Sequence, residues 1–172
     1  MDERHDEAVT DESAGDDRWT VQAIGRVSST RDEPIDDDWD AVGATITLDD
    51  RFGIEAIAGL ADFSHIEVIF LFDRVDPDSV TTGARHPRGN PDWPEVGVFA
   101  QRVKNRPNRI GLSTCAVLGV DGRTISVGGL DAVEGTPVLD IKPYMEEFAP
   151  RTPVRQPSWS RELMQGYFDS TG

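Results

Sequence analysis

Residues 112–132 read LSTCAVLGVDGRTISVGGLDA and hold the clearest folding signal in the chain. Two segments rich in Val, Ile and Thr flank Asp121-Gly122, and an Asp-Gly step between such segments is typical of a tight β-hairpin. We therefore expect two antiparallel strands here, at about 112–121 and 123–132.

Other strand-like segments precede this hairpin. They share β-branched or aromatic residues and end in polar, Gly or Pro residues. They are 20–29 (TVQAIGRVSS), 44–49 (ATITLD), 65–75 (HIEVIFLFDRV) and 95–101 (EVGVFAQ). Several short strands with little helix predict an all-β protein built as a barrel. The apolar run 65–75 predicts a central strand with both faces covered, by the barrel interior and by a partner subunit.

The remaining segments predict the domain organisation. Residues 1–18 are strongly acidic with almost no large apolar side chain, so we expect a disordered tail. Residues 19–150 form the expected barrel domain, with a loop at 30–40, a short helix or turn at 52–60 and a long loop at 76–94. A C-terminal extension, 151–172, contains VRQPSWSRELMQGYF, which predicts a helix with Ser158 as N-cap.

The composition is strongly acidic. The formal net charge is -15, with 32 acidic and 17 basic residues, and among the basic residues only Lys104 and Lys142 are lysines. Dense carboxylates with scarce lysine predict a halophilic protein; an ordinary acidic cytosolic protein is the alternative. In concentrated salt the Debye length falls to about 3 Å, so repulsion between this chain and RNA would be screened.

Cysteine content and hydropathy favour a cytoplasmic protein. Cys115 is the sole cysteine, which excludes an intrachain disulfide, and its apolar neighbours predict a buried structural thiol. The sequence contains no apolar run long enough to span a bilayer as a helix, and its N-terminus is acidic, unlike a signal peptide. We therefore expect a soluble protein of the cytoplasm without membrane contact.

The segment 97–144 is polar in a way that a structural core does not require. VFAQR, NRPNRIGLS and GLDAVEGTPVLDIKPY crowd Arg, Asn, Asp, Gly and Pro between short apolar strands. Together with the earlier GLADFSHIEVIFLF, these motifs resemble the TrmO or TsaA-like family of S-adenosylmethionine-dependent tRNA methyltransferases. The match runs in order from about Ile24 to Tyr144, and GTPVLDIKPY is its most specific part.

This resemblance implies a fold, a cofactor and an activity. The fold is a single-sheeted antiparallel β-barrel with short peripheral helices. The implied protein is a homodimer that binds S-adenosyl-L-methionine near the subunit interface and methylates N6 of threonylcarbamoyladenosine at tRNA position 37. Transfer of a methyl group from a sulfonium to nitrogen needs positioning and sometimes a base, and needs no metal.

The resemblance also assigns a cofactor-binding set. The matched positions are Phe72, Asp73, Arg102, Leu112, Ala132, Val133, Glu134 and Gly135. Arg102 is the expected cation for the cofactor; without the resemblance it would be read as a solvated strand arginine. The segment 132–135 would offer main-chain contacts, and the alternative is a simple turn at the barrel end.

Two matched positions depart from the family pattern. Relatives commonly have Pro-Arg-Gln in the first loop, where this chain has Asp36-Asp37-Asp38-Trp39. Relatives usually have His where this chain has Asp73, so a fixed negative charge replaces an imidazole. These departures, together with the short C-terminus, motivate a second hypothesis, in which the methyl acceptor is a small molecule or another nucleoside. A third is a non-catalytic module that binds the cofactor as a dimer.

Asp140, Lys142 and Tyr144 alternate along GTPVLDIKPY and would share one face of an extended chain. They are the candidate catalytic residues: Asp140 for the proton on N6, Lys142 for a substrate carboxylate and Tyr144 for stacking or donation. The alternative is an internal Asp140–Lys142 pair that only stabilises the strand.

One basic cluster stands out in the acidic sequence. It consists of Lys104, Asn105, Arg106, Asn108 and Arg109, residue types that suit phosphates and base edges. We expect this cluster to bind tRNA; pairing with surface carboxylates is the alternative. His65 lies in an apolar context and is expected to be structural rather than a base.

Overall fold

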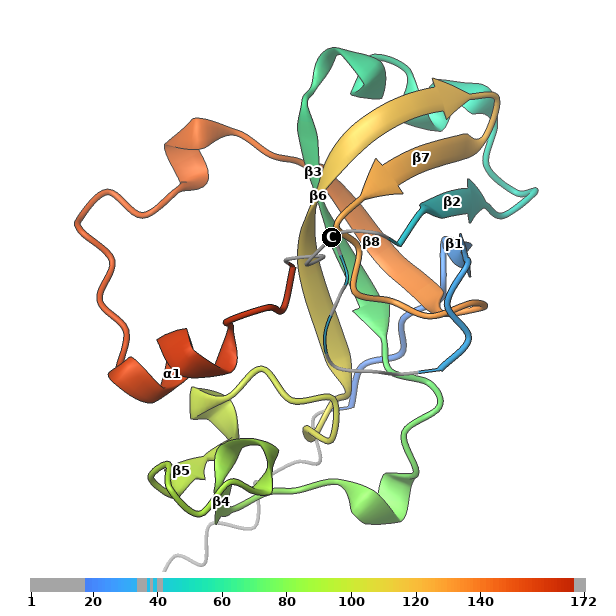
Figure 1. Ribbon diagram of the computed structural model, residues 1–172. Helices are drawn as coiled ribbons and strands as arrows, with labels where there is room; N and C mark the ends of the chain where they lie inside the picture. Colours follow the sequence, from blue (N-terminus) through green and yellow to red (C-terminus); the bar gives the residue numbers. More distant parts are fainter. Residues whose placement is uncertain (1–17, 34–36, 38, 40–41, 169–172) are drawn as a thin grey trace, which may run out of the picture.

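The computed structural model describes residues 18–33, 37, 39 and 42–168. Its centre is a closed six-stranded barrel in which each strand pairs antiparallel with its neighbours, in the order β1-β2-β7-β6-β3-β8 and back to β1 (Figure 1). The six strands are β1 (Gly25–Ser29), β2 (Ala44–Leu48), β3 (His65–Leu71), β6 (Ile110–Asp121), β7 (Thr124–Gly128) and β8 (Pro137–Pro143). The predicted single-sheeted antiparallel barrel is confirmed.

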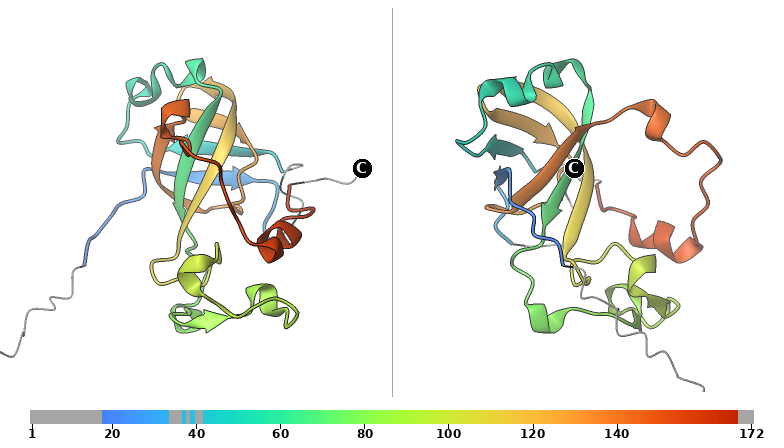
Figure 2. Two further views of the ribbon diagram at one scale, coloured as in Figure 1. Left: turned by 90° about the vertical axis from the view of Figure 1, so that its left-hand side faces the viewer. Right: turned by 180° about the vertical axis from the view of Figure 1, so that it is seen from behind.

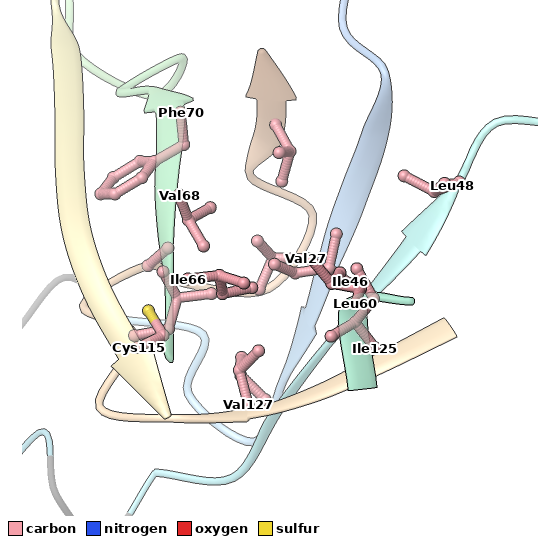
Figure 3. Close-up of a cluster of buried hydrophobic side chains, with 14 of the residues drawn as sticks. Val27, Ile46, Leu48, Leu60, Ile66, Val68, Phe70, Cys115, Ile125 and Val127 are labelled. Carbon is pink, nitrogen blue, oxygen red and sulfur yellow. The ribbon is translucent and has the colours of Figure 1, made fainter. Parts of the chain in front are cut away.

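Alternation of side chains decides which residues fill the barrel. In β3, Ile66, Val68 and Phe70 are buried, whereas the residues between them are half-buried or exposed. Inward residues from the other strands complete one core, of which Figure 3 shows Val27, Ile46, Cys115, Ile125 and Val127. Val138 of β8 belongs to the same core. Burial of an aliphatic side chain of this size contributes roughly 1.5–3 kcal/mol, so this core accounts for the main stabilisation of the fold.

The predicted hairpin is present with a small shift. Asp121 and Thr124 are the last paired residues of β6 and β7, so Gly122 and Arg123 form the two-residue turn. Gly122 has φ 57°, a conformation that glycine adopts without a Cβ clash. The aspartate of the Asp-Gly pair therefore ends the strand, and glycine alone meets the demand of the turn.

One predicted strand is largely wrong. Residues 95–101 do not join the barrel: β5 (Val96–Gly97) pairs with β4 (Ala84–Arg85) in a separate two-stranded sheet, and a 3₁₀ turn, Val98–Ala100, follows. The buried Gln101 side chain donates to the carbonyls of Arg85 and Val96 at 3.1 and 2.8 Å. These bonds fold the chain back on itself, so the alternating pattern of 95–101 reflects local burial rather than a barrel strand.

The expected peripheral elements are short. The predicted helix or turn at 52–60 is present as the 3₁₀ turn η1 (Ile54–Ile57), and a second 3₁₀ turn, η2 (Leu60–Asp62), follows Gly59, which has φ 83°. Further 3₁₀ turns are Pro77–Ser79, Pro87–Gly89 and Glu146–Phe148. The predicted acidic tail lies outside the described residues, apart from Arg18.

The C-terminal helix is confirmed as α1 (Ser158–Leu163). Ser158 is its first residue rather than its N-cap, which is Pro157, and no side chain caps the helix. After α1 the chain runs back toward the barrel (Figures 1 and 2). Within the described residues, no helix combines the length and the apolar character needed to cross a membrane.

Candidate active site

The end of β3 and the start of β6 bring several predicted cofactor residues together. The Phe72 amide donates to the Arg109 carbonyl at 2.8 Å, which ties the residue after β3 to the residue before β6. The Phe72 ring packs edge-on against Phe70, with centroids 5.2 Å apart. Asp73 is exposed, and Leu112 remains 41% exposed on the outer face of β6. This end of the barrel therefore presents apolar surface beside a solvated carboxylate.

Arg102 lies against the same strand. Its guanidinium donates to the Leu112 carbonyl, and the side chain is exposed. Arg102 follows the 3₁₀ turn Val98–Ala100 and does not belong to a strand. The structure thus joins the predicted cation to a predicted apolar contact, and a solvated strand arginine does not describe its position.

The segment 132–135 forms a tight turn between β7 and β8. Gly135 has φ 80° and donates its amide to the Val27 carbonyl at 2.9 Å. The Glu134 carboxylate accepts the Ser29 amide at 2.6 Å, so it serves the turn itself. Ala132 and Val133 are buried, which leaves mainly main-chain atoms for a ligand to contact.

Arg74 is a residue that sequence reasoning missed. Its guanidinium donates to the carbonyls of Asp32, at 2.7 Å, and Glu134, at 2.5 Å. It therefore connects the end of β3 with the first loop and with the turn 132–135. The sequence offers little signal for this role of Arg74, because a single arginine after an apolar strand looks the same in sequence whether its side chain is solvated or bound.

Asp131, also missed, is held from two sides. One carboxylate oxygen accepts from the Ser113 hydroxyl of β6, and the other accepts from the Tyr167 hydroxyl at 2.8 Å. The neighbouring Cys115 thiol is fully buried, as predicted; burial first, and the Asp131 charge second, raise the pKa of the Cys115 thiol from 9.0 to about 12. Cys115 is therefore protonated and unreactive in the native protein.

Two candidate catalytic residues, Asp140 and Lys142, lie on the outer face of β8, and the third, Tyr144, directly follows this strand. Asp140 pairs with Ile69 and Lys142 with Glu67 of β3, and the Tyr144 amide donates to the His65 carbonyl at 3.0 Å. Their partners Ile69, Glu67 and His65 alternate with the buried residues of β3, so the predicted common face is present. A bulge between Ile69 and Phe70 sets this register.

Asp140 and Lys142 form an ion pair at 2.7 Å. A second Asp140 oxygen accepts the amide of Ile141 at 3.0 Å. The hydrogen bond to Asp140 and then the charge of Asp140 raise the pKa of Lys142, with Glu67 acting in the same direction. Lys142 is exposed and cationic, and it is suited to binding an anion rather than to removing a proton.

The register places one predicted catalytic residue near the predicted cofactor contacts. Ile69 pairs with Leu112 on β6 and with Asp140 on β8, so the three residues form one row across the outer face. With neighbouring strands about 4.8 Å apart, Leu112 and Asp140 lie about 10 Å from each other. Tyr144 lies beside His65, seven residues or about 23 Å along β3 from Phe72. The single chain therefore brings Asp140, but not Tyr144, near the predicted cofactor residues.

Hydrogen bonds join most residues of the basic cluster to neighbouring segments of the chain. The Asn105 side chain donates to Ser79 Oγ at 2.7 Å, Arg106 donates to the Gln101 carbonyl at 3.4 Å, and Arg109 donates to the Val75 carbonyl at 2.9 Å. Arg109 also has φ 51°. Asn108 is exposed and Lys104 is half-buried. The cluster forms one loop beside the start of β6, with its guanidinium groups bound to main-chain carbonyls rather than to carboxylates.

The first loop has an arrangement of its own at the position of the expected Pro-Arg-Gln. Arg88 bonds both Asp37 oxygens, at 2.7 and 3.1 Å. The Arg31 guanidinium donates to the Asp37 carbonyl at 2.7 Å and lies 4.4 Å from the centre of the Trp39 ring. Asp36 and Asp38 lie outside the described residues. Trp39 is buried against Val42, Val133 and Tyr167.

A cavity of about 470 Å³ lies elsewhere, between β8 and the 3₁₀ turns η1 and η2. Its walls are apolar except for Asp140. It does not include the predicted cofactor residues, which lie on an open surface. Among the described residues, no group of three His, Cys, Asp or Glu side chains could hold a metal ion.

Comparison with known families identifies the barrel. A family model described as "tRNA-methyltransferase O N-terminal domain" matches residues 26–150. The chain belongs to the TrmO family. The matched range includes the six strands apart from the first residue of β1, and it ends before α1. The resemblance of the GTPVLDIKPY region is thus confirmed by the whole barrel.

Individual TrmO relatives and a solved TrmO structure are similar to this chain over most of its barrel. The chain is 38% identical over 113 residues to the Escherichia coli "tRNA (adenine(37)-N6)-methyltransferase", a match to 62% of this chain and 46% of that protein. It is 34% identical to a Pyrococcus abyssi "Probable S-adenosyl-L-methionine-binding protein", covering 77% of this chain and 71% of that one. A crystal structure of TrmO from Pseudomonas aeruginosa superposes with TM-score 0.66 at 30% identity, covering 83% of this chain and 62% of that chain.

The lengths of these TrmO relatives differ. The chain spans 23% of the human "tRNA (adenine(37)-N6)-methyltransferase", to which it is 38% identical over 102 residues, or 59% of this chain. The alignment with the Escherichia coli protein spans less than half of that protein. The shared part is the barrel.

Proposed function

We propose that this TrmO-family protein is an S-adenosylmethionine-dependent methyltransferase that modifies N6 of threonylcarbamoyladenosine at tRNA position 37. The observation that carries the proposal is the row Leu112–Ile69–Asp140, which sets a carboxylate about 10 Å from an exposed apolar residue bound by Arg102. Relatives named tRNA (adenine(37)-N6)-methyltransferase support the same activity.

The residues at the barrel end fit the proposed cofactor. Phe72 and Leu112 offer apolar surface for an adenine ring, and the exposed Asp73 and Arg102 match an ammonium and a carboxylate. The turn 132–135, in which Gly135 has a positive φ, permits close approach of main-chain atoms. Asp73 also complements a sulfonium, the role in which its negative charge is an advantage over imidazole.

The chemistry that S-adenosylmethionine supplies when bound is an electrophilic methyl group on a positively charged sulfur. Methylation of N6 leaves one proton to remove, and we assign its removal to Asp140. Both Asp140 oxygens already accept a hydrogen bond, yet a carboxylate has about four lone-pair sites and keeps room for another donor. Lys142, kept cationic by its raised pKa, would bind the carboxylate of the threonyl group. Tyr144 would contact a more distant part of the substrate.

The loop 104–109 is proposed as the tRNA contact. Hydrogen bonds to Ser79, Gln101 and Val75 hold Asn105, Arg106 and Arg109 in place, and the two half-buried arginines supply the positive charge of the loop. Phosphate contacts of this type orient an RNA rather than read its sequence. The contact would work in the cytoplasm and in concentrated salt, where screening removes the repulsion from the acidic surface.

We further propose a homodimer that uses the outer face of β3 and β6. Ile110 and Leu112 are each more than 40% exposed at the start of β6, and Ile69 and Leu71 are half-buried on β3. An apolar strip of this kind on a sheet face is typical of an interface.

The alternative function is methylation of a small molecule or another nucleoside. The Arg88–Asp37 pair and the buried Trp39 favour this alternative, because they lie in the first loop, where relatives commonly have Pro-Arg-Gln.

Calorimetry with S-adenosylmethionine in concentrated potassium chloride tests the cofactor site. We expect micromolar binding by the natural chain and at least tenfold weaker binding by Arg102→Ala, a loss of about 1.4 kcal/mol. Arg123→Ala, which removes a half-buried arginine paired with Asp50 at the hairpin, is the matched control and should bind normally. Absence of binding by the natural chain would overturn the proposed function.

Transfer of a labelled methyl group separates the acceptors. tRNA with threonylcarbamoyladenosine at position 37, the same tRNA without that modification, and free nucleosides are compared. We expect transfer to the modified tRNA, and a reduction of about 10²-fold or more in Asp140→Asn with cofactor binding unchanged, the size typical of a lost general base. Asp121→Asn at the exposed hairpin is the control. Transfer to nucleosides alone would favour the alternative.

A further inference from the structure

The C-terminal residues Ser158–Phe168, here called the strap, lie beyond the part that matches the TrmO model. Residues 150–158 are exposed and link the barrel to α1, which has six residues and no buried side chain. A helix this short is not stable alone in water, so its position depends on contacts with the rest of the protein. Figure 2 shows the chain after α1 returning to the barrel.

Between described residues, three hydrogen bonds attach the strap to other parts of the protein. Glu162 accepts from the Trp93 indole at 2.9 Å, near the small β4–β5 sheet. The Tyr167 carbonyl accepts the Trp39 amide at 3.1 Å, and the Tyr167 hydroxyl donates to Asp131 at 2.8 Å. Two of the three contacts therefore involve Tyr167 and residues next to the candidate cofactor turn.

Tyr167 also packs where the first loop meets that turn. Its ring contacts the cluster of Trp39, Val42 and Val133, in which Trp39 is 4% exposed. The Trp39 indole N–H has no acceptor among the residues that the structure describes, and the described contacts of the first loop here are its main chain, Arg31 and packing. Removing the Tyr167 ring would open this cluster, whereas removing its hydroxyl would keep the ring and take away the hydrogen bond to Asp131.

Asp131 transmits the contact to the turn. It precedes Ala132 directly, and its second oxygen is bound by the Ser113 hydroxyl on β6. With both hydroxyls present, the carboxylate is fixed between the barrel wall and the strap. Loss of one donor would leave Asp131 free to rotate about the Ser113 bond, and the main chain of 131–135 would follow.

We propose that Tyr167 is a positioning residue of the cofactor site: through Asp131 it holds the turn 131–135 in the conformation that binds S-adenosylmethionine. This inference rests on the proposed function for the identity of the ligand. It assigns the strap a role in binding, whereas a purely structural role would only attach the C-terminal residues to the barrel.

Hydrogen exchange without cofactor tests the positioning directly. Tyr167→Phe in the full chain keeps the ring and removes the hydroxyl. We expect faster exchange of the Glu134, Gly135 and Thr136 amides, which donate to Arg31, Val27 and Val133. Ser160→Ala is the matched control, because the Ser160 hydroxyl donates to the Pro157 carbonyl at 2.9 Å, directly before α1, and its loss should leave these amides unchanged.

Calorimetry on the same variants tests the link to the cofactor. A lost hydrogen bond to a charged group predicts about tenfold weaker S-adenosylmethionine binding by Tyr167→Phe. Unchanged exchange at 134–136 would overturn the positioning role, even if exchange within the strap increased. Faster exchange with unchanged affinity would overturn the role in binding. If the natural chain binds no S-adenosylmethionine, the proposed function and the binding role both fail, and the exchange result still decides whether Tyr167 positions the turn.

Discussion

Cys115 lies in the middle of β6 with its thiol inside the barrel and close to Asp131. The Ser113 hydroxyl donates to the Asp131 carboxylate, and the Cys115 thiol lies 3.8 Å from the Ser113 carbonyl, so these three residues lie together. Burial and the Asp131 charge both oppose ionisation of the thiol. At the residue scale, the same carboxylate thus serves the core, the turn 131–135 and the strap.

The raised pKa of the Cys115 thiol predicts that the free energy of unfolding decreases at alkaline pH. Its pKa rises from 9.0 to about 12 on folding, so the unfolded chain loses this proton first as pH increases. The stabilisation is complete below pH 9 and is lost between pH 9 and 12, at up to about 1.4 kcal/mol per pH unit. We expect the free energy of unfolding, measured with urea from pH 8 to 10.5, to fall more steeply than in Cys115→Ala. Parallel curves would contradict this.

At the scale of elements, β6 joins the parts of the site. Its first residues pair with β3 beside Phe72, its inner face binds Asp131 through Ser113, and its outer face presents Leu112 to Arg102. The strand can approach β3 closely at Gly111, which faces the Phe70 ring. Further along, a bulge at Val117–Gly119 leaves Gly119 beside open space.

These two glycines of β6 predict opposite responses to the same change. A Cβ at Gly111 would collide with the Phe70 ring, whereas a Cβ at Gly119 has no atom within 4 Å. We expect Gly111→Ala to lower the free energy of unfolding by about 1–3 kcal/mol through overpacking, and Gly119→Ala to change it by less than about 0.5 kcal/mol. Urea unfolding of both variants measures this; equal losses would refute the packing argument.

At the scale of the whole molecule, the barrel is closed, but the face formed by β3, β6 and β8 is incompletely covered. Apolar side chains and the row Leu112–Ile69–Asp140 lie on it together. A second copy on this face would remove apolar surface from water and enclose the open site. Exclusion of water would strengthen the electrostatic contacts of Arg102 and Asp140.

Light scattering in concentrated potassium chloride measures whether two chains form a dimer through the face of β3, β6 and β8. We expect twice the mass of one chain for the natural protein and a shift toward one chain for Ile69→Lys, because a charge would be placed in the apolar face. Thr47→Lys, on the exposed face of β2, is the matched control and should remain a dimer. A natural chain that stays monomeric at every concentration would rule out the proposed dimer.

Local pattern determined much of this protein. Alternation and the Asp-Gly signal were sufficient for β2, β3 and the β6–β7 hairpin, because strand period and turn chemistry depend on neighbouring residues. The motif GTPVLDIKPY was sufficient for the TrmO family, and its alternation for the shared face of Asp140 and Lys142. The C-terminal helix followed from its own residues as well.

Tertiary contacts decided the rest. Residues 95–101 do not form a barrel strand, because the Gln101 side chain donates to the carbonyls of Arg85 and Val96 and folds the segment back. No strand pattern in the sequence encodes such a bond. Asp131 and Tyr167 are 36 residues apart, and Arg74 reaches Asp32 and Glu134 across 42 and 60 residues. The nearness of Asp140 to Leu112 likewise required the register of three strands. Side chains that act on distant main chain leave no local period, so only the closed barrel could place them in one site.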